Sequence, residues 1–305
     1  MKTNVLCKAF ATAGLAAVVF SACNKVETPE TTTDSLVAAK VLAGIQTKAS
    51  GSTWDASDAI GITTTNNKKK DGNEYTNVKF TNDGTGIFHG SSPIYFQNKE
   101  NVTFTAYYPF IDPEGNVPGT LGSIDANTGA ANQSGDAQKQ IDFMWARTTT
   151  DVTNPTVSFT GSAAFTHKMS MLTLTFKNSD DVLISDLKKY KLGGITLEGQ
   201  FDTNDGNATA VGTAADLEIN ITTTETSQYT AGSLILFPQT ITGGKIALEI
   251  TLNEQTYKAD LALAALAPGK NHTFNITVKK TGISTASAEI TDWTDETPID
   301  AEATM

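Results

Sequence analysis

Cysteine is nearly absent from this chain of 305 residues, which holds only Cys7 and Cys23. Both lie at the N-terminal end, so the long remainder of the chain can form neither a disulfide nor a cysteine-based metal site. The stability of any domain in that remainder must come from buried apolar side chains.

Positive charge is also scarce, with 22 Lys and Arg against 33 Asp and Glu and a formal net charge of −11. A surface with this excess of negative charge repels nucleic acids and anionic lipid surfaces at long range. We therefore expect no nucleic-acid partner, and any membrane attachment must use something other than a basic surface.

Long apolar runs are missing except at the start of the chain, where Lys2 and Lys8 precede an apolar run over residues 9–20. That run is shorter than the roughly 20 residues that a permanent membrane helix needs, but it is typical of a secretory signal peptide. It ends in Ser-Ala-Cys, which resembles the lipobox of bacterial lipoproteins. We predict a signal peptide over residues 1–22 and a lipid on Cys23, with a plain signal peptide and an incidental cysteine as the alternative.

Residue patterns for catalysis and metal binding are lacking as well. His89, His167 and His272 are far apart and show no metal-ligand spacing. The Asp- and Gly-containing segment 202–206 favours a tight hairpin turn over a calcium loop, because its spacing is short by one residue and no Glu follows at the required place. We predict no catalytic residue, no metal and no cofactor. Two carboxylates that meet only in the fold remain a separate possibility.

What the sequence does contain is a series of short alternating segments separated by turn residues. Residues 23–35 are polar and predict a flexible tether, in which Ser35 belongs to a three-residue O-glycosylation-like motif. After the tether, one apolar face at period two predicts a strand, with an alanine-rich helix as the alternative. The residues of that face are Val37, Ala39, Val41, Ala43 and Ile45. A loop of small residues around Lys48 follows, and loops of this kind are favoured sites of proteolysis.

The same alternation recurs further along, as in residues 102–108, where Tyr107 and Tyr108 face opposite sides and Pro109 ends the strand. Residues 112–140 predict a long surface loop, and residues 259–267 a short helix. About a dozen expected strands exceed the seven of one β-sandwich. We therefore predict an all-β chain with two β-sandwich domains in tandem, over residues 36–160 and 161–295, and an acidic tail over 296–305.

Three aromatic residues have two interpretations. Trp54, Tyr107 and Trp293 lie near strand ends or on the second face of a strand. Packing between sheets or domains is the first interpretation. A platform for stacking sugar rings is the second, and it would make the protein a monomeric glycan-binding lipoprotein of the outer surface.

Several segments resemble the fimbrillin-type (Mfa-like) lipoproteins of Bacteroidota, from Cys23 to about Trp293. These segments are 47–49 (Thr-Lys-Ala), 54–62 (starting Trp-Asp), 94–96 (Ile-Tyr-Phe), 104–110 (Phe-Thr-Ala-Tyr-Tyr-Pro-Phe), 142–146 (Asp-Phe-Met-Trp-Ala), 165–170 (Phe-Thr-His-Lys-Met-Ser) and 290–293 (Ile-Thr-Asp-Trp). The resemblance implies two transthyretin-like β-sandwich domains in tandem. It also implies export to the outer membrane surface as a lipoprotein and assembly into a fimbria as a stalk, anchor or tip subunit.

In related subunits a trypsin-like protease removes the lipidated N-terminal strand after a basic residue, and a strand of the neighbouring subunit fills the groove. Lys48 is the residue of this chain at the matching position. The resemblance thus implies that other fimbrial subunits are the partners, with surface ligands of the host or of other bacteria as further candidates. A hydrolase on the same scaffold would instead require carboxylates that converge in a cleft.

Overall fold

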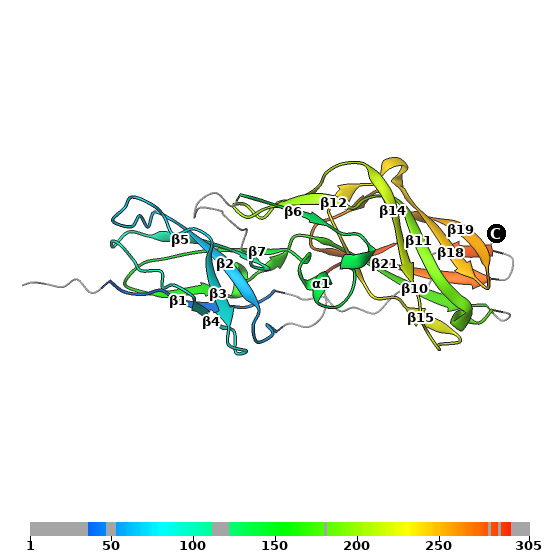
Figure 1. The fold of residues 1–305 in the computed structure, drawn as a ribbon, viewed down its shortest axis with the longest axis horizontal. Coiled ribbons are helices and arrows are strands. Elements are labelled where there is room, and N and C mark those ends of the chain that lie inside the picture. Colours follow the sequence, from blue (N-terminus) through cyan, green and yellow to red (C-terminus); the bar gives the residue numbers. More distant parts are fainter. Residues whose placement is uncertain are drawn as a thin grey trace, which may run out of the picture. The chain divides into compact units, whose positions relative to one another are not determined.

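The computed structural model describes residues 36–46, 53–111, 122–179, 182–279, 282–285 and 288–293 (Figure 1). These residues are nearly all in strands and turns, which confirms the predicted all-β sandwich fold class. Within these ranges, no helix is long and apolar enough to cross a bilayer. The predicted signal peptide, Cys23, the tether over 23–35, Lys48 and the acidic tail all lie outside the described residues.

The first part of the chain forms an eight-stranded sheet around an apolar core. In spatial order its strands are β8 (Thr156–Phe159), β1 (Lys40–Ala43), β4 (Ile87–Gly90), β3 (Val78–Asn82), β2 (Ala59–Thr65), β5 (Val102–Tyr108), β7 (Met144–Thr150) and β9 (Thr166–His167). Alternate side chains of these strands enter the core, and β5 follows the predicted pattern with its last residue directly before Pro109.

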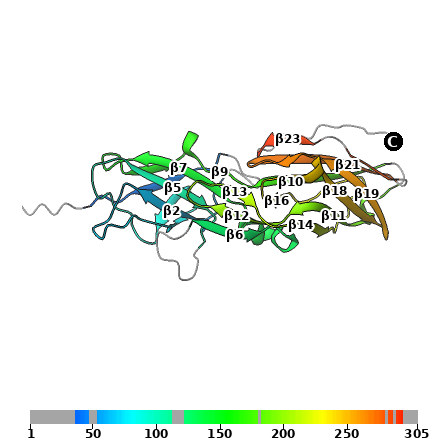
Figure 2. The same ribbon diagram turned by 90° about the horizontal axis from the view of Figure 1, so that it is seen from above.

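The second part forms a six-stranded and a four-stranded sheet around a separate core. The six-stranded sheet contains β15 (Gln228–Thr230), β10 (Ser170–Asn178), β21 (Lys270–Lys279) and β22 (Gly282–Thr285), with β16 (Leu234–Leu236) paired to β10 and β23 (Glu289–Asp292) paired to β21. The four-stranded sheet contains β14 (Ala214–Asn220), β11 (Leu187–Thr196), β18 (Lys245–Leu252) and β19 (Gln255–Ala262). Figure 2 shows β23 beside β21, in agreement with their antiparallel register.

Each part places its first strand between an antiparallel neighbour and a parallel one. In the eight-stranded sheet, β1 pairs antiparallel with β4 and parallel with β8. In the six-stranded sheet, β10 pairs antiparallel with β15 and β16 and parallel with β21. The two first strands therefore have the same kind of inner position.

The predicted surface loop over 112–140 is wrong for its second half. Residues 122–140 contain β6 (Ser123–Asn127), a 3-10 helix (Ala130–Asn132) and the short helix α1 (Gly135–Lys139). The strand β6 joins a three-stranded sheet with β12 (Glu198–Asp202) and β13 (Ala208–Ala210). Its pairing partner is distant in sequence, so local composition gave no signal for it.

The predicted helix over 259–267 is also wrong. Most of that segment belongs to β19, which pairs with β18 across a two-residue turn, and to β20 (Ala265–Leu266), which pairs with β17 (Gln239–Thr240). Asn253 and Glu254 form the turn with positive φ values of 45° and 66°, as a type I′ hairpin turn requires. Cross-strand pairing thus overrides the helix propensity of alanine.

A third apolar cluster draws on both parts of the chain. It contains Tyr107, Ile124, Ile141, Phe143, Met169, Met171, Phe201, Ile235, Phe237 and Trp293. The chain crosses between the two larger cores over residues 160–170, because β9 still belongs to the first sheet and β10 to the second. The domain boundary near residue 160 stays a prediction.

Candidate functional site

The predicted N-terminal strand lies beside β4 (Figure 1) and is an inner strand of the first sheet, with β8 on its other side. Hydrogen bonds extend over residues 37–46, beyond the four residues of β1. On one side Ala39 N donates to Ile94 O (2.8 Å), Ala43 N to Gly86 O (3.1 Å) and Phe96 N to Val37 O (2.9 Å); on the other, Lys40 N donates to Pro155 O (2.9 Å), Gly44 N to Phe159 O (2.9 Å), Gln46 N to Phe165 O (2.9 Å) and Phe165 N to Gly44 O (3.1 Å). The segment is therefore bonded to the rest of the sheet along both edges.

One face of this strand is buried, as the alternation predicted. Val41 and Ala43 are 2% and 5% exposed and belong to the first core, while Ala39 and Ile45 pack against it. Val37 was predicted on the same face but is exposed. The reason is the register: Lys40 pairs with Thr156, the first residue of β8, so residue 37 lies beyond the end of that neighbouring strand.

Trp54 fixes the C-terminal end of this strand. Its indole Nε1 donates a buried hydrogen bond to the carbonyl of Ala43 (2.9 Å). Three rings meet the indole edge-on at centroid distances of 5.2 to 5.4 Å, those of Phe88, Tyr108 and Phe165. This hydrogen bond could not be predicted from the sequence, since nothing there shows which carbonyl an indole will meet.

The burial of three aromatic side chains contradicts a sugar-stacking platform made from them. Trp54, Tyr107 and Trp293 are only 7%, 3% and 2% exposed. The hydroxyl of Tyr107 donates to Asn77 Oδ1 (2.8 Å), and Trp293 stacks on His167 with a centroid distance of 4.1 Å. Their role is packing, which was the first of the two interpretations.

The comparisons with known proteins agree with this architecture. A family model described as fimbrillin-like matches residues 47–293. The chain belongs to the fimbrillin-like family. A candidate fimbrium subunit of Bacteroides uniformis, Fim1C, is 30% identical over 303 aligned residues, which cover 92% of this chain and 93% of that protein.

Solved structures resemble this fimbrillin-like fold. A candidate cell adhesion protein of Bacteroides ovatus is 27% identical with a TM-score of 0.71, over 86% of this chain and 99% of that one. The tip fimbrial protein Mfa3 of Porphyromonas gingivalis has a TM-score of 0.54 over 84% of this chain and 100% of that one. Because Mfa3 is only 10% identical, the likeness concerns the fold alone.

A surface hollow accompanies the N-terminal strand of this fimbrillin-like protein. It has a volume of about 470 Å³ and lies over β1 and β4, between Lys40, Leu42, Ile87 and Pro93. Ile87 is 43% exposed there. The outer face of the strand is thus partly apolar, although the alternation placed only its inner face in contact with apolar neighbours.

Carboxylates do converge at one other place, beside helix α1. Asp55, Asp58 and Asp136 line a hollow of about 520 Å³. Each has a structural partner: Asp55 and Asp136 pair with Lys139 at 3.0 and 3.7 Å, and Asp58 accepts the hydroxyl of Tyr108 at 3.1 Å. Burial and the neighbouring Asp58 raise the pKa of the Tyr108 phenol. The arrangement joins the turn before β2 to the helix, rather than presenting an acid and a base.

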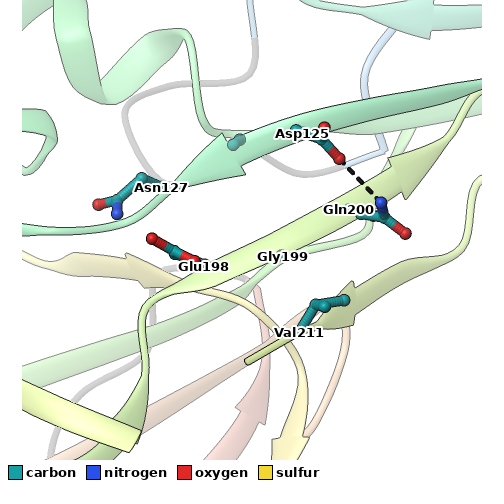
Figure 3. A pocket seen from close by; sticks show the side chains of 7 residues that line it. Asp125, Asn127, Glu198, Gly199, Gln200 and Val211 are labelled. Atoms are coloured by element: carbon teal, nitrogen blue, oxygen red, sulfur yellow. Dashed lines mark hydrogen bonds between the residues drawn. The ribbon is translucent and has the colours of Figure 1, made fainter. Parts of the chain in front are cut away.

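A third hollow lies on the outer surface of the small sheet that contains β12 and β6 (Figure 3). It has a volume of about 420 Å³ and is lined by exposed polar side chains, including Asn127 and Glu198. Gln200 Nε2 donates to Asp125 Oδ1 across the two strands (2.8 Å). On the other side of the sheet, Gly199 leaves room for the ring of Phe237, which a Cβ would meet at 2.5 Å.

The histidines occupy three separate environments. His89 is exposed next to Asp83 (3.3 Å), and His167 is buried against Asp142 (2.7 Å). His272 is fully buried and accepts the backbone N–H of Ala267 at 3.1 Å, and burial lowers its pKa to about 4. In the part of the chain that the structure describes, no group of His, Cys, Asp and Glu has an arrangement suited to a metal ion. The segment 202–206 forms the predicted hairpin turn between β12 and β13.

Proposed function

We propose that this protein is a fimbrial subunit that is exported as a lipoprotein through Cys23, cut after Lys48 and assembled by strand exchange. In this proposal, cleavage releases the segment that ends at Lys48, and a strand of a neighbouring subunit takes the place of residues 37–46. The observation that carries the proposal is the bonding of these residues along both edges, shortly before Lys48 in the sequence.

Removal of an inner strand leaves a specific vacancy. The carbonyls of Ile94, Gly86, Pro155 and Phe159 would lose their donors, and the side chains under Val41 and Ala43 would lose their cover. Each buried polar group without a partner costs about 1 to 3 kcal/mol. A second extended segment restores both the hydrogen bonds and the apolar contacts, which is the physical basis of recognition by strand addition.

The rest of the molecule is consistent with a structural role. A subunit of this kind needs no catalytic residue and no cofactor, because its assembly depends on backbone hydrogen bonds and apolar burial. Its partners are other fimbrial subunits, and its proposed location is the cell surface, in a fimbrium built from a lipid-anchored precursor. The net charge of −11 keeps an exposed protein from binding anionic surfaces without specificity.

The test is the intact mass and polymer state of the exported protein with and without a trypsin-like protease. We expect a species that begins at Ala49 and a ladder of oligomers on a gel run without boiling. The variant Lys48→Gln should stay uncut and monomeric, whereas Lys40→Gln, which alters an exposed lysine inside the strand, should behave as wild type. A protein that is cut at Lys48, releases its strand and stays monomeric would refute the proposed assembly.

A further inference from the structure

We infer that Trp54 selects the strand that occupies this place in the sheet, by requiring a small residue at the position of Ala43, and that its indole N–H holds this strand through the backbone carbonyl of that residue. This inference rests on the proposed strand exchange. It gives Trp54 a role in recognising a strand rather than a sugar, and it defines the chemistry of the partner strand.

Trp54 stays with the subunit after the proposed cleavage, because it follows Lys48 in the chain. Its ring is held among Phe88, Tyr108 and Phe165, which all belong to the part of the sheet that remains. The indole N–H would therefore still point to the place of the Ala43 carbonyl when the strand has left. Because this N–H donor is already aligned, it loses little entropy when it binds the backbone carbonyl of an incoming strand at position 43.

The backbone of Ala43 is held by two hydrogen bonds, and its side chain is buried. Its N–H donates to Gly86 O (3.1 Å), and its carbonyl accepts the Trp54 indole (2.9 Å). Gly86 has a φ of +87°, and a Cβ there would lie 3.3 Å from the Ala43 carbonyl. The Ala43 side chain is 5% exposed within the core that contains Trp54. A larger side chain here would overpack this core.

The native strand therefore shows what the groove accepts. A strand that enters it needs a branched apolar residue at the position of Val41, a small residue at that of Ala43 and an apolar residue at that of Ile45. Leu42 lies between these positions and is only half-buried, so its place tolerates more variation. The partner that fits is an extended segment of another subunit with this apolar–small–apolar pattern at alternate residues.

The test uses a chain with a specific protease site introduced within residues 47–52, cut after folding so that the strand is held without a covalent link. Fluorescent peptides with the sequence of residues 36–46 then compete for the groove, and their affinity is measured by anisotropy. We expect the Ala43→Val peptide to bind at least about tenfold more weakly than the native peptide, because of overpacking. The matched Leu42→Val peptide should bind within about threefold of the native one.

Substitutions of Trp54 in the protein test the role of its indole N–H and of its ring. Trp54→Phe keeps most of the ring but removes the N–H, and should weaken the native peptide about fivefold, as expected for one lost hydrogen bond. Trp54→Leu leaves space, and should reduce the discrimination between Ala and Val at position 43 to less than about threefold. The control is Trp145→Phe: that indole donates to Thr203 O (3.1 Å), away from the groove, and its loss should leave peptide affinity unchanged.

The outcomes separate the inference from the proposed function. If no peptide enters the cut protein, strand exchange fails and the selection by Trp54 fails with it. If the native and Ala43→Val peptides bind equally well, or if Trp54→Phe has no effect on affinity, strand exchange stands and the role of Trp54 is refuted. The peptide series does not depend on the folding of any protein variant, so an unstable Trp54 variant does not prevent this decision.

Discussion

The first strands of the two parts of this chain occupy the same topological place but are held very differently. β1 has four residues, and Lys48 follows it in the sequence. β10 has nine residues and pairs over most of its length with β21. That strand pairs in addition with β22 and β23. The same arrangement thus holds one short strand, β1, and one long strand, β10, which pairs with β21 over most of its length.

The difference in burial follows the difference in length. β10 contributes Leu172, Leu174 and Phe176 to the second core, all nearly inaccessible to solvent. β1 contributes one valine and one alanine to the first core. Because the free energy of burial grows with apolar area, at about 25 cal/mol per Å², β10 stabilises its sheet far more than β1 does. The proposed release of residues 37–46 thus concerns the less buried of the two strands.

Hydrogen exchange gives the largest contrast between the two strands. Because β1 buries little apolar area, we expect it to open without global unfolding, whereas opening of β10 should require loss of the second core. We expect amides of residues 39–44 to exchange at least about 1,000-fold faster than those of residues 171–177, as local and global openings differ by several kcal/mol. Mass spectrometry of peptic fragments measures this ratio. Equal protection of both strands would show that β1 is held as firmly as β10.

Truncation of one buried side chain in each strand compares what the two strands contribute to the free energy of unfolding. Leu174→Ala should lower the free energy of unfolding by about 3 kcal/mol, as is typical for a buried leucine. Val41→Ala removes less apolar area and should lower it by at most about 2 kcal/mol. Urea denaturation followed by tryptophan fluorescence measures both values. A larger effect for Val41→Ala than for Leu174→Ala would show that β1 is the more important strand for stability.

Local patterns in the sequence predicted these strands unequally well. Residues 102–108 were predicted at their observed bounds, because strict alternation reports a half-buried strand. β6 was missed because its partner β12 lies 75 residues away for the pair Asp125 and Gln200. The alternation also identified the strand at the candidate site. It could not identify the parallel neighbour β8 or the bond from Trp54 to Ala43, since both depend on tertiary contacts.

The second part also contains a buried ionisable side chain next to β10. His272 pairs with Leu172 of β10, and burial lowers its pKa to about 4 from an ordinary value of 6.5. Between these values the unfolded chain binds a proton that the folded chain does not, so the free energy of unfolding should fall as the pH drops from 6.5 to 4. The total loss is about 3 kcal/mol at roughly 1.4 kcal/mol per pKa unit.

Urea unfolding at several pH values measures this dependence. His272→Gln keeps an acceptor for the Ala267 N–H and should have a flatter profile between pH 6.5 and 4. His89→Gln changes an exposed histidine of the first part and should follow the wild-type profile. If His272→Gln retains the full wild-type slope in this range, the acid sensitivity has another source, such as the carboxylates.

The smallest expected effect concerns the outer face of the four-stranded sheet. Lys191 lies between Asp216 (3.2 Å) and Glu249 (2.8 Å), and Lys258 contacts Glu249 at 2.7 Å. The bond to Glu249 raises the pKa of Lys191, and the two lysines lower that of Glu249 to about 2. These pairs are exposed to solvent, where ion pairs add little stability. Lys191→Gln should change the Tm by less than about 3 °C in calorimetry, whereas Leu174→Ala should change it severalfold more. Comparable Tm shifts from the two variants would mean that the charged face contributes as much to the stability of the second part as β10 and its core do.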